Sequence, residues 1–432
     1  MALEFAHGAI QWSESDALNT IFTVSGLSFQ PKALRFYWVG LGSTIDASSE
    51  TVNSVRGVGF GVSPSSRRCV SSVSVDAAGN AACATRANDN GVVSIIASDA
   101  SEDGRLDLNS ITSDGFTLIV DDVLFLATES DITIFWEAWG GSDITVAAVG
   151  DIAEPAATGN VDYTVTGFVA GATDQVVMFA GVQSVAALNT GDANDSGMHV
   201  GFSTATDATF VCGNSDDGSA TMDTDGMSTG GFSWNMITIG GGAPNASNIL
   251  SQFGTNNFRL NWITRATTNR RSIFLAIKGG NWKVGNYIIN GNTGGATTTV
   301  SGLSFAPIGL CLLGRMSSSG SGETNDRIGL GTGSSTSSRR SMGVLDEDGI
   351  ADAEIDTTIQ YDQVLSFPST TGTLQSAYDI DAMNADGFRI IVDTAGGVAN
   401  EIQGYLTFGN VAAGGAQAPL LMHGQQYMRT SR

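Results

Sequence analysis

The chain has 432 residues, of which 55 are Gly, about twice the ordinary share, and its 15% of charged residues compares with about 25% in an average protein. Asp and Glu outnumber Lys and Arg by 43 to 20, and the net charge of −23 excludes a general nucleic-acid binder, whose surface must attract phosphates. Hydrophobic residues make up 42%, which is enough to form cores and excludes a disordered chain.

The N-terminal residues 1–16 contain no basic segment followed by an apolar run, and nowhere do eighteen apolar residues occur together. The sequence therefore predicts no signal peptide, no membrane span and no membrane partner. The cysteines lack metal-ligand spacing and have small or apolar neighbours, which predicts buried free thiols; a pair between the first two across a hairpin is the alternative. They are Cys69, Cys83, Cys212 and Cys311.

Short runs of β-branched and aromatic residues, bounded by Gly, Asp, Asn and Ser, predict strands along the whole chain. Frequent Asp-Gly pairs supply the left-handed backbone conformations of hairpin turns, which accounts for much of the Gly excess. Helical periodicity is confined to 373–383, where one or two turns of helix are predicted. The clearest strand runs are 34–39, 116–120, 132–136, 176–180, 273–277 and 389–392.

Internal repetition organises these strands. VSGLSFQP at 24–31 returns as VSGLSFAP at 300–307, and DGFTLIVD at 114–121 returns as DGFRIIVD at 386–393. A third copy is expected halfway between the two and is found at VTGF, 165–168, although it lacks the Pro of the other copies. The chain therefore contains three copies of one module.

Several short strands within each copy predict an all-β fold of three tandem jelly-roll-like β-sandwich modules with little helix. Linkers rich in small and polar residues are expected near 142–160 and 281–297. The predicted domains are module 1 with an N-terminal arm over 1–149, a divergent module 2 over 150–286, module 3 over 287–415 and a C-terminal tail over 416–432.

The residues indicate no catalytic chemistry. His7, His199 and His423 do not recur between the copies, so neither a Ser/His/Asp set nor a histidine metal centre is indicated. GxSxG at 226–230 lies in a Gly/Ser-rich loop of a β module, without the strand-to-helix turn that a nucleophile needs. A glycan hydrolase would require two carboxylates across a groove, which a single sequence cannot place. We therefore expect no enzyme and no cofactor.

Three acidic segments, at 99–107, 216–225 and 346–354, gather carboxylates around a Gly. Hard oxygen ligands in such loops can hold Ca²⁺, but none of the segments has the EF-hand spacing. Solvated hairpin turns are the favoured interpretation, and calcium is the alternative. The candidate calcium ligands are Asp99, Asp103, Asp107, Asp346 and Asp348.

Paired arginines recur in the outer two copies, as Arg67 and Arg68 in module 1 and as Arg339 and Arg340 in module 3. In a chain with few basic residues this repetition indicates either internal ion pairs with the acidic loops or a contact with an acidic neighbouring subunit. The two interpretations remain open at this point.

Aromatic residues supply further candidates for interaction. Trp residues inside strand runs predict core packing, whereas Trp234 and Trp282, in Gly/Asn-rich surroundings, are candidates for exposed contact residues. The tail contains Tyr427 together with Leu and Met side chains. This segment either docks on a neighbouring subunit or is a frayed chain end.

The order VxGLSFxPKAL, then GFG…SRR, then DGFxLxV, resembles the repeated β modules of structural proteins of tailed bacteriophages, over residues 20–410. The resemblance implies a virion protein, made in the host cytoplasm, on the capsid surface or the tail, with other virion proteins such as the major capsid protein as partners. We expect a capsid decoration or cement protein; the alternative is a tail fibre or adhesin that recognises host glycans. Three fused copies are compatible with a single-chain mimic of a trimer, a linear array or a homo-oligomer.

Overall fold

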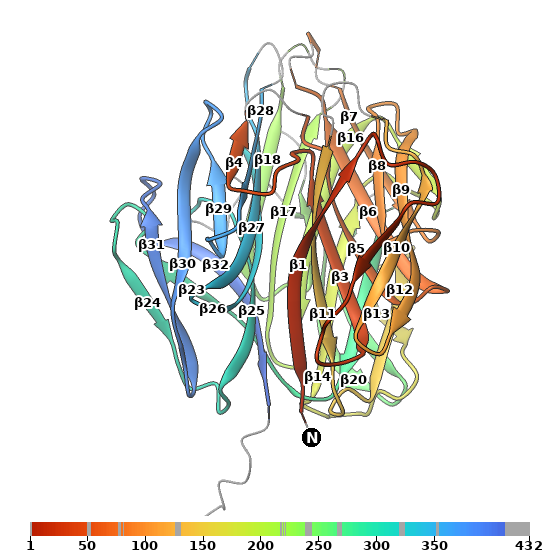
Figure 1. Cartoon of the computed structure of the whole chain (residues 1–432), viewed down its shortest axis with the longest axis vertical. Coiled ribbons are helices and arrows are strands. Elements are labelled where there is room, and N and C mark those ends of the chain that lie inside the picture. Colours follow the sequence, from red (N-terminus) through yellow and green to blue (C-terminus); the bar gives the residue numbers. More distant parts are fainter. Residues whose placement is uncertain are drawn as a thin grey trace, which may run out of the picture.

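The computed structural model contains strands and no helix in the part of the chain that it describes, and these strands form six antiparallel sheets (Figure 1). The all-β prediction is confirmed. The helix predicted at 373–383 is wrong, because this segment is strand β30 (Leu374–Asn384), in which Tyr378 and Ile380 are buried two residues apart, with the period of a strand. The described residues are 2–49, 53–76, 79–80, 82–125, 131–216, 218, 220, 222–237, 244–265, 270–318, 325–350 and 354–410.

Each module consists of two sheets, a larger inner sheet and a four-stranded outer sheet. In module 1 the inner sheet has the order β1-β11-β3-β5-β6-β7, and the outer sheet has the order β2-β10-β9-β8. The strands are β1 (Glu4–Ser13), β2 (Ile21–Val24), β3 (Pro31–Val39), β4 (Ala47–Ser49), β5 (Arg56–Ser63), β6 (Ser66–Ser74), β7 (Cys83–Asn88), β8 (Val93–Ile96), β9 (Glu102–Thr112), β10 (Gly115–Asp122) and β11 (Asp131–Gly140).

Module 2 repeats this plan, with an inner sheet β12-β22-β14-β16-β17-β18 and an outer sheet β13-β21-β20-β19. Its strands are β12 (Val146–Ala153), β13 (Gly159–Thr164), β14 (Gln175–Val182), β15 (Thr190–Asp192), β16 (Asp195–Ser203), β17 (Ala208–Asp216), β18 (Thr224–Gly230), β19 (Trp234–Ile237), β20 (Pro244–Gly254), β21 (Asn257–Thr264) and β22 (Arg271–Lys278).

Module 3 has an inner sheet β23-β32-β25-β26-β27-β28 and an outer sheet β24-β31-β30-β29. Its strands are β23 (Asn281–Ile289), β24 (Thr297–Val300), β25 (Pro307–Gly314), β26 (Asp326–Ser335), β27 (Ser338–Asp346), β28 (Ile355–Gln360), β29 (Leu365–Pro368), β30, β31 (Gly387–Thr394) and β32 (Glu401–Gly409).

The segments expected as linkers contain the first strands of modules 2 and 3. β12 pairs with β22 and β23 pairs with β32 along their whole lengths. Their small residues, taken as a sign of a linker, make room for aromatic rings of the paired strand: a Cβ on Gly150 would lie 2.5 Å from the ring of Phe274. The segments are therefore part of the inner sheets.

Four strands of each inner sheet form a meander, and the last strand of the module returns between its first two inner-sheet strands, as β11 does between β1 and β3. β3, β5, β6 and β7 pair successively within one sheet. A jelly roll is instead built from two Greek keys. Two-sheet modules are thus present in the structure, but a jelly-roll topology is not confirmed.

The three inner sheets pack against one another around one central hydrophobic core. Phe60, Met178 and Leu313 bring modules 1, 2 and 3 into this core, and each module also has a core between its own two sheets. Along β3, Tyr37 belongs to the central core and Trp38 to the core of module 1. Both faces of the strand are covered, which explains why residues 33–39 are apolar except for Arg35.

Two short strands cross from one module to another. β4 leaves module 1 and pairs with β28 at the edge of the inner sheet of module 3, where Figure 1 shows it in red beside the blue strands. β15 leaves module 2 and pairs with β7 at the corresponding edge in module 1. Module 1 thus gives a strand to module 3, and module 2 gives a strand to module 1. Both transfers have the same direction around the molecule, so the three modules are arranged as a ring rather than a row.

All four cysteines are buried and free, as the sequence predicts.

Candidate functional site: the seams between modules

Each pair of neighbouring modules meets along a seam, where the second strand of an inner-sheet hairpin lies against the first strand of the next module. Seam 1/2 joins β6 to β12, seam 2/3 joins β17 to β23, and seam 3/1 joins β27 to β1. The hairpins of seams 1/2 and 3/1 carry the paired arginines.

The first arginine of each pair binds inside its own module. Arg67 donates from Nε to Oδ1 of Asp107 at 2.7 Å, and Arg339 forms an ion pair with Asp379. Both carboxylates lie in the outer sheet, on β9 and β30, so these pairs hold the outer sheet to the inner one. Asp107, one of the candidate calcium ligands, is thus the partner of an arginine.

The second arginine reaches across the seam. Arg68 lies with Nε 3.8 Å from Oδ1 of Asp151 on β12, and Arg340 lies with Nη1 3.2 Å from Nδ1 of His7 on β1. Desolvation and the charge of Arg340 lower the pKa of His7 to about 3, so the imidazole is neutral in this contact. Adjacent strand residues point to opposite faces, which is why the two members of a pair have different partners.

A buried ion pair at the centre of the molecule touches all three modules. Nη2 of Arg35 donates to Oε1 of Glu137 at 2.8 Å, with the two side chains 1% and 0% exposed. The guanidinium lies 5.3 Å from the ring centroid of Phe202 in module 2, and Cys311 and Thr332 of module 3 lie close enough to Glu137 to affect its pKa, which burial raises.

A second buried cluster also joins the three modules. Arg56 of module 1 forms ion pairs with Asp326 and Asp346 of module 3, and Asp346 accepts hydrogen bonds from Ser74 at 2.8 Å and from Ser215 of module 2 at 2.6 Å. Burial raises the pKa of Asp326 to about 6 against the lowering effect of Arg56. Asp346, expected in a solvated turn, is fully buried because it neutralises Arg56.

The remaining candidate calcium ligands lie in turns and strands. Asp99 accepts a hydrogen bond from the backbone N–H of Ser101 at 2.9 Å, and Asp348 accepts one from that of Thr224 at 3.1 Å. Burial, with the charge of Asp99, raises the pKa of Asp103. Within the described ranges no group of three or more His, Cys, Asp or Glu side chains is placed to hold a metal ion.

Trp282 is buried rather than exposed. It is 6% exposed, its indole N–H donates to the carbonyl of Gly279 at 2.7 Å, and its ring lies 5.3 Å from that of Phe408. Its Gly-rich surroundings reflect a tight turn with positive φ at Gly279 rather than an exposed loop.

The side chain of Trp234, at the start of β19, and all of Tyr427 lie outside the described residues. The tryptophans in strand runs are buried as predicted, at Trp38, Trp136, Trp139 and Trp262.

Seam 1/2 is hollowed by a groove of ≈ 630 Å³, between the β5–β6 turn of module 1 and the start of β12. Lys32 lies on this groove and donates from Nζ to the carbonyl of Ile144 at 2.7 Å. The groove therefore has both polar and apolar walls drawn from two modules.

The central charged residues were not among the candidates taken from the sequence, although the sequence contains a signal for them. Arg35 interrupts the apolar run LRFYWV and Glu137 interrupts FWEAWG. A charged residue inside a strand buried on both faces needs a buried partner. The opposite charges of these two residues could have paired them.

No protein-family model matches the chain, and no curated protein matches its sequence significantly. Across the described residues there is no helix of the length and apolarity that a membrane crossing requires.

Proposed function

We propose that this chain is a non-enzymatic structural protein of a virus particle, a decoration or cement protein that binds the capsid at a threefold or quasi-threefold position. The observation that carries the proposal is the ring of three modules around one core, tied by exchanged strands. Such a chain presents three related surfaces about one axis, which matches three copies of a neighbour arranged in the same way.

The differences between the modules favour a quasi-threefold position over a strict one. Arg35, Glu137 and Arg56 come from module 1 alone, whereas Asp326 and Asp346 come from module 3. A chain with three distinct modules fits three neighbours whose environments differ slightly. The proposed partner is the major capsid protein, and the net charge of −23 favours a basic surface on it.

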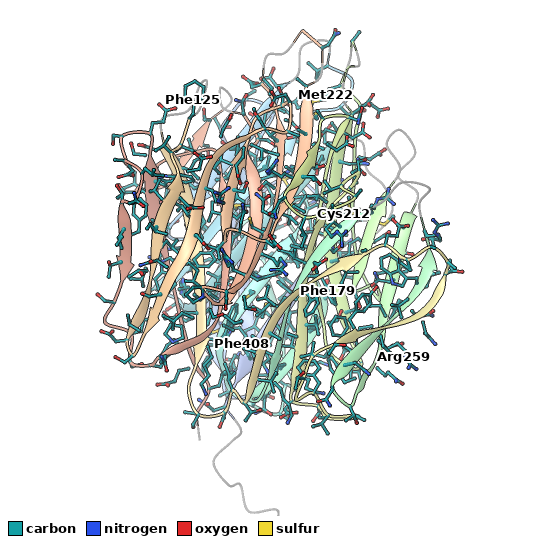
Figure 2. All side chains as sticks on the ribbon, turned by 90° about the vertical axis from the view of Figure 1, so that its right-hand side faces the viewer. Phe125, Phe179, Cys212, Met222, Arg259 and Phe408 are labelled. Atoms are coloured by element: carbon teal, nitrogen blue, oxygen red, sulfur yellow. The ribbon has the colours of Figure 1, made fainter. Side chains whose placement is uncertain are left out.

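One end of the ring is the proposed contact surface. Figure 2 shows Phe125 and Met222 at the same end, far from Phe408. Phe125 is 70% exposed, and Ile350, also exposed, accepts a hydrogen bond through its carbonyl from the N–H of Met222 at 2.9 Å. Val123, two residues before Phe125, is also exposed, and exposed apolar side chains that lie together are typical of an interface.

Cryo-electron microscopy of purified virions tests this proposal. We expect density for one chain over the junction of three capsomers, with the end that carries Phe125 toward the capsid. Phe125→Ser should reduce the number of copies per particle, whereas Val169→Ser, at an exposed site in the loop before β14, should not. Density at the tail would overturn the decoration role and favour the adhesin that recognises host glycans.

A further inference from the structure

Exposed apolar side chains line one face of the outer sheet of module 1. Ile21 of β2 is 53% exposed and lies opposite Ile119 of β10. Leu18 lies beside the end of β10, because the N–H of Asn19 donates to the carbonyl of Val120 at 2.9 Å. Two exposed aliphatic side chains therefore lie at the edge strand of this sheet.

The same face continues beyond the end of β10. Val123 and Phe125 are exposed and alternate with Leu124, which is buried in the core of module 1. The N–H of Phe125 donates to the carbonyl of Asp103 on β9 at 2.7 Å, so the ring lies at the end of the molecule where Figure 2 labels it. We call this surface the module 1 face; its exposed apolar side chains are Leu18, Ile21, Val123 and Phe125.

The matching face of module 3 carries small or polar residues instead. The hydrogen bond of Asn19 to the end of β10 recurs in module 3, where Gly295 donates to the end of β31, and β24 pairs with β31 as β2 pairs with β10. The residues of module 3 at the four exposed positions are Gly294, Thr297, Ala395 and Gly397. Beneath the face the core is kept, since the buried Phe116 matches the buried Phe388. The fold of the module therefore does not require an apolar face.

Carboxylates surround the module 1 face. Arg105 is paired with Asp121 at 2.6 Å, whereas no ion pair joins Asp99, Asp103 or Asp122 to a cation among the described residues. Burial, and then the charges of Asp99 and Asp122, raise the pKa of Asp103, so the three carboxylates lie close enough to act on one another. The face is therefore negative as well as apolar.

Module 3 lacks this charge too. The turn at 97–101 recurs at 369–373 with the same backbone hydrogen bonds, which aligns the two segments. The residues of module 3 that match Asp99, Asp103 and Asp122 are Thr371, Gln375 and Thr394. Apolar character and negative charge thus occur together on one module and are both missing from its copy.

Module 2 has a polar edge strand at the corresponding place. β13 exposes Asn160, Asp162 and Thr164, and Nε of Arg259 donates to Oδ1 of Asp162 at 2.6 Å. Over the described ranges, module 1 alone therefore presents an apolar edge strand beside carboxylates that have no ion-pair partner.

We propose that the module 1 face binds one neighbouring protein, through a surface of that protein that combines apolar side chains with Lys or Arg. The inference rests on the proposed decoration role and deepens it, because a contact made by one module fixes the chain in one rotational setting about the ring axis. The apolar contact supplies affinity, and the complementary charge selects the partner and speeds association.

Virus particles made without this chain test the proposal when the purified full chain is added back and the bound copies are counted by quantitative mass spectrometry. Ile21→Thr combined with Val123→Ala introduces the residues that module 3 carries, so the melting temperature should not change. This double variant should bind about tenfold more weakly than wild type, because two apolar side chains are lost from the contact. Thr297→Ala, at the exposed matching site of module 3, is the control and should leave binding unchanged.

The charge of the partner is tested by Asp103→Gln combined with Asp122→Thr, again the residues of module 3. Association of the wild type should slow as the salt concentration rises, since salt screens the attraction. The variant should associate more slowly at low salt and respond less to salt. An unchanged salt dependence would overturn the basic character of the partner.

The outcomes separate the inference from the decoration role. If wild type binds the particles and Ile21→Thr with Val123→Ala binds equally well, the module 1 face is not the contact, although the decoration role stands. Equal frequencies of three rotational settings of the bound chain in cryo-electron microscopy would also overturn the inference. If wild type does not bind the particles, the decoration role is wrong, and the inference with it.

Discussion

Single buried charged side chains connect the modules. Arg35 with Glu137, and Arg56 with Asp326, each contact side chains of more than one module. A buried ion pair adds little net stability compared with apolar residues of the same size, but removal of one partner costs about 3–5 kcal/mol. Arg56 and Asp326 lie in different modules, so we infer that this pair disfavours wrong orders of the modules, since only one order brings its opposite charges together.

Glu401 illustrates how burial changes a single carboxyl group. It lies in the core of module 3, where it accepts a hydrogen bond from Tyr378, and burial raises its pKa from 4.5 to about 7. The folded state therefore keeps the proton up to about pH 7, whereas the unfolded state releases it near pH 4.5. The free energy of unfolding consequently falls by about 3 kcal/mol as the pH rises through this interval.

Glu401→Gln should remove this pH dependence, because the amide cannot ionise and can still accept from Tyr378. Urea unfolding at pH 8 should show a more stable variant than the wild type, and the difference should shrink toward zero at pH 5. Asp362→Asn, at an exposed site of the same module, should show no such pattern. Equal stability of Glu401→Gln and wild type at pH 8 would contradict the argument.

Two short strands cover open edges of the inner sheets of neighbouring modules. β4 and β15 have three residues each, yet they cover the outer edges of β28 and β7. An open edge presents unpaired N–H and C=O groups to any other strand and favours aggregation. The exchanged strands therefore protect the sheets of their neighbours rather than their own.

Gly191→Val should displace β15 from β7, since a Cβ at this position would lie 2.6 Å from Cβ of Ala100 and 2.9 Å from the carbonyl of Thr85. Hydrogen–deuterium exchange should become faster at the amide of Ala87, with a small loss of melting temperature. Gly79→Val introduces the same side chain where no atom lies within 4 Å and should leave exchange unchanged. Protection that survives Gly191→Val would rule out the role of β15.

The elements also show what the sequence could and could not predict. Strand runs and repeats predict the modules because their signals are local. β12 and β23 were missed because their small residues are explained only by aromatic rings on the paired strands. Likewise, the sequence repeat identified Arg67 and Arg68, and the alternation of side chains along a strand places them on opposite faces. The partner of Arg68, however, depends on which module lies next to it.

The shared core determines the behaviour of the whole molecule. Its residues come from all three inner sheets, and near one end Phe408 of module 3 lies 4.7 Å from Phe5 and 5.8 Å from Trp139 of module 1, between ring centroids. Each module therefore buries one face of its inner sheet only in the presence of the others. Unfolding of one module exposes apolar surface on its neighbours.

Scanning calorimetry should accordingly show one transition for the full chain. Phe408→Ala should lower the free energy of unfolding by about 3–5 kcal/mol and shift that transition as a whole. Phe253→Ala, in the core between the two sheets of module 2, should also shift one transition, because the modules are coupled. Two or three resolved transitions in the wild type would show that the modules unfold independently.

The exchanged strands have a consequence for synthesis on the ribosome. Module 1 lacks β15 until module 2 has emerged, and β4, made early, must wait for β28 of module 3. The inner faces of the first two modules can cover each other only in part, and the rest of their apolar surface stays exposed until the inner sheet of module 3, which ends with β32, has been translated. The nascent chain thus exposes apolar surface for most of its translation, which is the situation in which a chaperone is needed.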